Sequence, residues 1–233
     1  MSNEISLLDP SKHADLKVSK PDFSQVADEH ILPITLHEFS RAATEYPIVF
    51  VKNSETGKFQ SVVMLGLKPE QNLSVVNGEW VGSYIPNAVK DYPFAVVLNA
   101  EQPDKIWIGI REQSKQVGTD AGEPLFKEGE ETPFFNQRRE SIVQHFEEEQ
   151  ASQSILQFLA EKELFRQQTL TVTVKGEQRN INGLYMVDEA KLNDLSDDDF
   201  LDLKKRGLLG PIYGHLTSLH QVNRLARTEM LSE

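Results

Sequence analysis

Residues 46–51 read Tyr-Pro-Ile-Val-Phe-Val, and residues 59–67 read Phe-Gln-Ser-Val-Val-Met-Leu-Gly-Leu. β-Branched and aromatic residues of this kind favour strands. The segment between the two runs contains Asn53 and Gly57, which favour a turn. Two strand-like runs around a short turn predict a β-hairpin at this point of the chain.

More strands are expected after this hairpin. Asn77-Gly78 is a strong signal for a tight type I′ turn between two strands. Because the connections are short, antiparallel pairing is favoured, and residues 46–110 are predicted to be mostly sheet. The further strands are expected at 72–76, 79–81, 92–98, 105–110, 169–174 and 181–187.

Helices are predicted at 35–43, 132–149, 155–164, 196–206 and 212–228. The helix from Ser196 has the clearest ends, because Ser196 can cap it and Gly207 can stop it. We therefore expect an α+β fold, with a largely antiparallel twisted sheet covered by C-terminal helices. Residues 1–30 are predicted to be a polar N-terminal arm and residues 31–233 a single domain, with the glycine-rich loop 111–131 as the plausible subdomain boundary.

The composition excludes several classes of protein. Of 233 residues, 24 are Lys or Arg and 36 are Asp or Glu, so the net charge is 24 − 36 = −12, which argues against nucleic acid as a partner. The chain has no Cys, which excludes disulfides and thiolate metal sites. The N-terminus lacks a basic start followed by an apolar run, and no stretch is long enough to insert into a membrane. A cytoplasmic location is therefore expected.

Several short segments together resemble the SapC family of bacterial proteins, over roughly residues 40–225. The family name comes from surface-layer protein export, and members are often encoded near outer-membrane receptors. The resemblance therefore implies a setting in envelope or uptake systems, and it implies no particular reaction. The segments that carry it are Tyr46–Phe50, Asn72–Val75, Gly78–Trp80, Tyr84–Pro86, Tyr92–Phe94, Gly183–Glu189, Lys191-Leu192, Tyr213–Leu216 and Ser218-Leu219.

Aromatic residues are the best candidates for ligand binding. Trp80, Tyr84 and Tyr92 lie within thirteen positions of one another, and Tyr and Trp combine apolar area with a polar group that suits peptide or sugar recognition. Tyr213 and His215 follow Gly210-Pro211 at the start of a predicted helix and are further candidates. The alternative for all five residues is packing within the fold.

Catalytic candidates are fewer. Asp188 and Glu189 follow an apolar strand, and with His215 they could act as general acids or bases. Capping of the next helix is the alternative for the two acids. The sequence has no Gly-x-Ser-x-Gly, Walker or Gly-x-Gly-x-x-Gly motif. Because His215 and His220 are five residues apart, their side chains do not converge on a helix, and no metal site is predicted. No cofactor is predicted either.

Residues 203–228 contain Lys204, Lys205, Arg206, Arg224 and Arg227 and no acid. This basic end could form a local site for a phosphate or a terminal carboxylate. The alternatives are salt bridges with the acidic block at 188–202 or a solvated face.

We expect a non-catalytic binding or accessory protein that recognises a peptide, a protein or a small metabolite. The alternative is an enzyme that modifies a peptide or an amino-acid-derived substrate by acid–base chemistry. A homo-oligomeric scaffold without a ligand is a third possibility, which requires a large apolar surface buried between chains.

Overall fold

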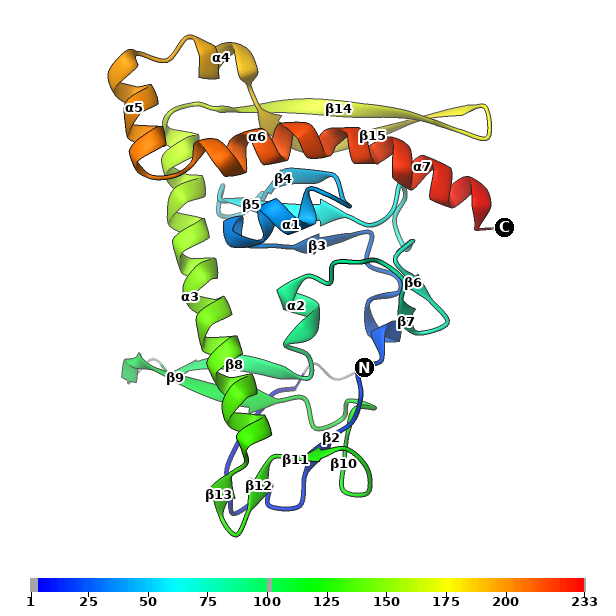
Figure 1. Ribbon diagram of the computed structural model, residues 1–233, viewed down its shortest axis with the longest axis vertical. Coiled ribbons are helices and arrows are strands. Elements are labelled where there is room, and N and C mark those ends of the chain that lie inside the picture. Colours follow the sequence, from blue (N-terminus) through cyan, green and yellow to red (C-terminus); the bar gives the residue numbers. More distant parts are fainter. Residues whose placement is uncertain (1–3, 100–101, 233) are drawn as a thin grey trace. The chain divides into compact units, whose positions relative to one another are not determined.

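The computed structural model describes residues 4–99 and 102–232, and the chain forms two compact units (Figure 1). Unit 1 consists of the residues up to Phe23 together with Asn87–Glu147. Unit 2 consists of Ser24–Pro86 and the residues from Glu148 on. Both units combine antiparallel sheets with helices, which confirms the predicted α+β class. The predicted division at residue 30 stays a prediction.

Unit 1 contains two three-stranded sheets. The first has the order β1 (Ser6–Leu7), β9 (Gln102–Ile110), β8 (Phe94–Asn99), and the second has the order β10 (Val117–Gly118), β2 (Lys17–Val18), β11 (Glu123–Pro124). Unit 1 also contains α2 (Asn87–Lys90), the pair β12 (Phe126–Lys127) and β13 (Glu130–Glu131), and the first half of α3 (Pro133–Glu161). The loop 111–131 therefore lies inside unit 1 and is not a boundary. The buried core of unit 1 includes Phe94, Ile110, Leu125 and Phe135.

Unit 2 is built on one five-stranded antiparallel sheet. Its order is β14 (Phe165–Val174), β15 (Glu177–Val187), β4 (Ile48–Lys52), β5 (Phe59–Met64), β3 (Ile31–Pro33). The hairpin predicted at 46–67 forms as β4 and β5, and the strands expected at 169–174 and 181–187 pair as β14 and β15. The two pairs join where Tyr185 pairs with Phe50. The strands within 46–110, predicted to form one antiparallel sheet, are divided between sheets. Within the described residues, β8 and β9 pair in unit 1, and β6 (Val75–Val76) pairs with β7 (Glu79–Trp80) as a separate two-stranded sheet.

The helices differ from the prediction in two places. One continuous helix, α3 (Pro133–Glu161), replaces the two expected at 132–149 and 155–164. The helix expected at 212–228 is interrupted by the 3₁₀ turn η3 (Leu219–Gln221), which separates α6 (Leu209–Ser218) from α7 (Val222–Leu231). The remaining helical elements are η1 (Phe23–Val26), η2 (Leu36–Glu38), α1 (Phe39–Ala42), α4 (Glu189–Asn193) and α5 (Asp197–Lys205). None of the helices in residues 4–99 and 102–232 combines the length and apolar character needed to cross a bilayer.

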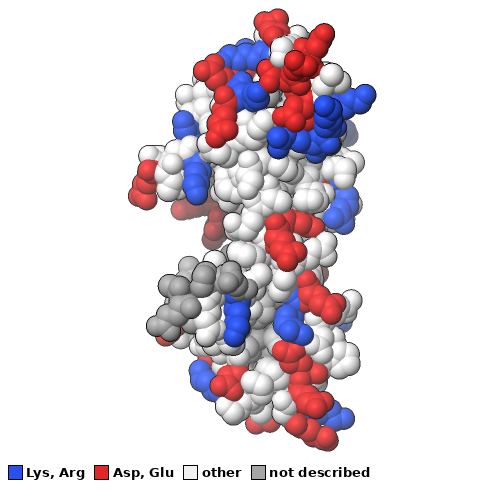
Figure 2. All heavy atoms as spheres, turned by 90° about the vertical axis from the view of Figure 1, so that its left-hand side faces the viewer, with Lys and Arg blue, Asp and Glu red and all other residues white. Residues whose placement is uncertain are grey.

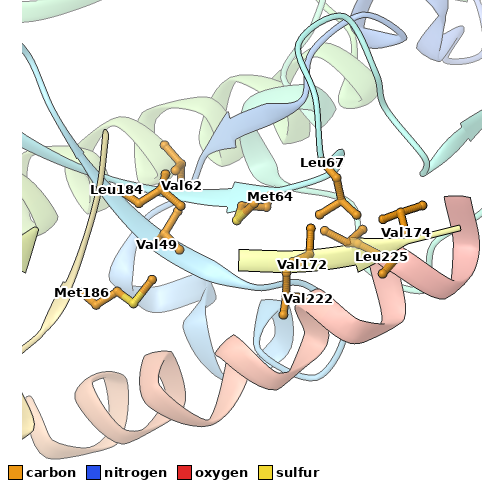
Figure 3. Packing of buried hydrophobic residues seen from close by; sticks show 11 residues of the cluster. Val49, Val62, Met64, Leu67, Val172, Val174, Leu184, Met186, Val222 and Leu225 are labelled. Atoms are coloured by element: carbon orange, nitrogen blue, oxygen red, sulfur yellow. The ribbon is translucent and has the colours of Figure 1, made fainter. Parts of the chain in front are cut away.

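The C-terminal helices cover the sheet of unit 2, as predicted. Figure 1 shows α6 and α7 running beside its strands, and Figure 3 shows the apolar side chains between them. Val222 and Leu225 of α7 lie beside Val172 of β14, in a cluster that continues through Val49 and Met64. Burying one such side chain contributes about 1.5–3 kcal/mol, so this cluster is a main source of stability in unit 2.

Candidate functional site

The segment Trp80–Tyr84, part of the predicted ligand surface, is held by a buried carboxylate of unit 2. Glu45 is 3% exposed and accepts hydrogen bonds from the backbone N–H of Ser83 (3.0 Å) and of Tyr84 (2.8 Å) and from Nη2 of Arg224 (2.9 Å). Burial acts to raise the pKa of Glu45, but the hydrogen bonds and the charge of Arg224 outweigh it and lower the pKa. Glu45 is therefore ionised at neutral pH and fixes the path of this segment.

Tyr84 is buried against a second carboxylate. Its hydroxyl donates to Oε1 of Glu38 at 2.6 Å, while Oε2 of Glu38 accepts from the backbone N–H of Thr35 at 2.8 Å. The backbone carbonyl of Tyr84 accepts from Nε1 of Trp80 (2.9 Å) and from the hydroxyl of Tyr46 (2.7 Å). Burial raises the pKa of Tyr84, and it raises that of Tyr46 to about 12. Trp80 and Tyr84 thus lie together, and their polar groups bond within the fold. Their role in ligand binding stays a prediction.

His215 links three elements of unit 2 from a fully buried position on α6. Nε2 accepts a hydrogen bond from the backbone N–H of Val187 (3.1 Å), so the proton is on Nδ1, which donates to the carbonyl of Ile48 (2.8 Å). Burial lowers the pKa of His215 to about 4. The imidazole is therefore neutral at pH 7 and uses both nitrogens to join α6 to β15 and β4.

Asp188 and Glu189 lie in the connection that follows β15. Asp188 is the N-cap of α4, and its carboxylate accepts a hydrogen bond from the backbone N–H of Ala190 at 3.1 Å. Glu189 is exposed in the first turn of the same helix. Helix capping, the alternative to an acid–base role, thus accounts for the position of Asp188. The structure shows no hydrogen bond between His215 and either acid in the part of the chain that it describes.

The two remaining candidates lie in different units. Tyr213 is on α6 and is 49% exposed. Tyr92 is half-buried in unit 1, where the guanidinium carbon of Arg111 lies 5.7 Å from the centre of its ring. Neither residue lines a hollow described below.

An apolar hollow of about 410 Å³ lies in unit 2, where η2 and α1 meet α3 and the turn between α5 and α6. Its surface is mostly apolar, which is typical of sites that bind small molecules or single side chains. Its lining residues are Leu36, His37, Phe39, Ser40, Ile155, Arg206, Gly207, Leu208, Gly210 and Pro211. We call these ten residues the apolar hollow.

The turn between α5 and α6 forms one wall of the hollow. Gly207 ends α5, as predicted, and has a φ of +72°. Its backbone N–H donates to the carbonyl of Lys204 (3.0 Å), and the backbone N–H of Leu208 donates to the carbonyl of Leu203 (3.0 Å). This is the Schellman motif, which glycine favours because it has no Cβ. A Cβ at Gly207 or at Gly210 would meet no atom within 4 Å. The space above both glycines is therefore available to another group.

Arg206 forms the basic rim of the hollow. Its guanidinium carbon lies 4.4 Å from the centre of the Phe158 ring, and Nε donates to both carboxylate oxygens of Asp202 at 3.0 and 3.1 Å. The end of unit 2 that carries α4 and α5 bears intermixed acidic and basic side chains at the top of Figure 2. The salt bridge between Arg206 and Asp202 joins the basic end to the acidic block, which was one of the alternatives for this segment, and Arg206 also lines the hollow.

Two other features of the structure bear on ligand and metal binding. A second hollow of about 330 Å³ in unit 2 is lined mainly by polar side chains, including Lys58, Gln60 and Gln153. It lacks the apolar surface from which most small-ligand affinity comes. No group of three or more His, Asp or Glu side chains that could hold a metal ion occurs within the described ranges.

Sequence reasoning found neither the apolar hollow nor the buried glutamates. The signal for the hollow was the spacing of Gly207 and Gly210-Pro211, which was used only to place the ends of helices. Glu38 gave only a capping signal, and nothing local to Glu45 marks it as buried.

Comparison with known proteins gives one match. The family model of SapC matches residues 8–225, which is most of the chain. Searches of curated proteins and of solved structures found no significant match.

Proposed function

The chain belongs to the SapC family, and we propose that it is a non-catalytic binding or accessory protein of this type. In this proposal it works in the cytoplasm and recognises a peptide, a protein or a small metabolite linked to envelope or uptake systems. The contact that we propose is an apolar group of the ligand seated in the apolar hollow.

The mostly apolar surface of the hollow carries this proposal, because such surfaces bind apolar groups of small ligands. A leucine- or phenylalanine-sized side chain that leaves water for such a surface gains about 1.5–3 kcal/mol. Part of this gain is offset by the loss of translational freedom on binding. We therefore expect a small probe to bind weakly, with a Kd on the order of 1 mM, and a larger ligand to add contacts outside the hollow.

The enzyme alternative, with Asp188, Glu189 and His215 as acid–base groups, has less support. His215 uses both ring nitrogens in hydrogen bonds to the backbone, and Asp188 caps α4. A general base needs a free lone pair within reach of a substrate proton, which His215 does not offer.

Two glycines of α6 provide a matched test. Gly210→Ala adds a methyl group inside the hollow, whereas Gly214→Ala adds the same group to the same helix at a position that does not line it. Apart from chain neighbours, a Cβ meets no atom within 4 Å at either position. Gly214→Ala should gain about 0.5–1 kcal/mol of helix stability. Gly210→Ala should gain less, because Pro211 follows it and disfavours the helical conformation for a residue with a Cβ.

The test is a titration of ¹⁵N-labelled protein with N-acetyl-L-phenylalaninamide, followed by NMR. Wild type and Gly214→Ala should bind the probe equally well. Gly210→Ala should bind it about threefold more weakly or worse, because its methyl group occupies space that the ring needs. Equal binding by all three proteins, or binding by none, would show that the hollow is not a ligand site.

A further inference from the structure

We infer that the ligand of the apolar hollow carries a carboxylate on the same carbon as its apolar side chain, and that Arg206 binds this carboxylate. The ligand class is the C-terminal residue of a peptide, for which an N-acetylated amino acid is the minimal probe. This inference rests on the proposed function, since it adds a second contact at the same hollow.

The charge of the lining points to an anionic ligand. Arg206 and His37 are the titratable side chains that line the hollow, and no Asp or Glu of the described residues does. The chain as a whole has 36 acidic and 24 basic residues. A hollow without a lining carboxylate is therefore the less expected arrangement in this chain, and it favours a negative group over a positive one.

The contacts of Arg206 leave its outer edge available. Nε is directed at Asp202, and the plane of the guanidinium is held over the ring of Phe158. No hydrogen bond from Nη1 or Nη2 is seen among the residues that the structure describes. These two nitrogens form the fork that binds a carboxylate through two parallel hydrogen bonds. Because the guanidinium is already held in place, little further side-chain order is needed to bind a ligand.

The position of Arg206 in the sequence sets the form of the ligand. Arg206 directly precedes Gly207 and Leu208, which line the apolar part. The cation and the open apolar surface are thus on consecutive residues. An amino acid suits such a wall, because its carboxylate and its apolar side chain share one carbon and can reach both parts together.

The expected gain is modest. Asp202 already balances part of the charge of Arg206, and both side chains are substantially exposed, at 53% and 40%. Exposed ion pairs are weak, whereas a two-pronged hydrogen bond to a carboxylate is stronger. We expect the carboxylate to improve binding by about three- to tenfold.

The test compares N-acetyl-L-phenylalanine with N-acetyl-L-phenylalaninamide, which differ only in the carboxylate, by NMR titration at fixed salt and pH 7. Wild type should bind the acid about three- to tenfold more tightly than the amide. Arg206→Gln should bind both equally, at the affinity of the amide. Lys205→Gln is the matched control, because it removes the same charge from the neighbouring exposed position, which does not line the hollow. It should keep the preference for the acid.

The outcomes separate this inference from the proposed function. If wild type binds the amide as tightly as the acid, and both probes shift the NMR signals of the hollow, the inference is wrong and the proposed function stands. If Lys205→Gln loses the preference as fully as Arg206→Gln, a general charge effect replaces the specific contact, and the inference is again wrong. If neither probe binds, the inference and the proposed function both fail.

Discussion

Substitution of His215 tests whether this residue is a structural histidine or an acid–base group. In the folded protein its pKa is lowered to about 4 by burial, against 6.5 for an exposed histidine. The unfolded chain therefore binds a proton at a pH where the folded chain does not. The stabilising effect is complete above pH 6.5 and is lost as the pH falls toward 4.

The size of the effect follows from these two values. Between pH 7 and pH 5, the difference in proton binding at His215 should lower the free energy of unfolding by about 2 kcal/mol. His215→Gln removes the titration and still offers an amide donor and an acceptor for Ile48 and Val187. Other groups titrate in both proteins, so the difference between wild type and variant isolates residue 215.

Urea unfolding of wild type and His215→Gln at pH 7 and pH 5 measures this difference. The stability advantage of the wild type over the variant should shrink by about 2 kcal/mol at the lower pH. An advantage that does not change with pH would refute the argument. Should the variant fail to fold, NMR of the wild-type imidazole decides the matter, because a midpoint above pH 6 contradicts a buried neutral ring.

Two further substitutions test the network around the segment Trp80–Tyr84. Tyr84→Phe removes the hydroxyl that donates to the buried carboxylate of Glu38 and should cost about 1.5–3 kcal/mol of stability by urea unfolding, so an unchanged midpoint would show that this bond is not needed. Gly82→Ala would place a Cβ 2.2 Å from the hydroxyl oxygen of Tyr46 and should cost about 1–3 kcal/mol of stability. Gly118→Ala is the control and should change stability little, because its Cβ meets nothing within 4 Å. Equal thermal midpoints for these two variants would contradict the packing described.

Local signals predicted local structure well. Ser196 and Gly207 mark the two ends of α5 as expected, and the strands predicted at 169–174 and 181–187 form as β14 and β15. The expected break within α3 was wrong. Residues 147–154 are polar and interrupt the apolar pattern, but Glu, Gln and Ala are good helix formers, so the helix continues through them.

The candidate site depends on contacts between distant parts of the sequence, which no local signal shows. Glu45 meets Arg224 across 179 positions, and His215 meets Ile48 across 167. Tyr84 was named for its aromatic ring, but its environment is set by Glu38, 46 positions away. Residue type alone thus selected candidate binding and catalytic residues, and only the fold shows that several of them are buried.

The apolar hollow is tested most directly by mapping where a ligand binds. The measurement is the change in backbone amide shifts of ¹⁵N-labelled wild-type protein on addition of N-acetyl-L-phenylalanine. The account predicts that the largest shifts lie at 36–40, at Ile155 and at 206–210. Largest shifts at Trp80–Tyr84 or at Asp188 and Glu189, or small shifts spread over the whole chain, would contradict it.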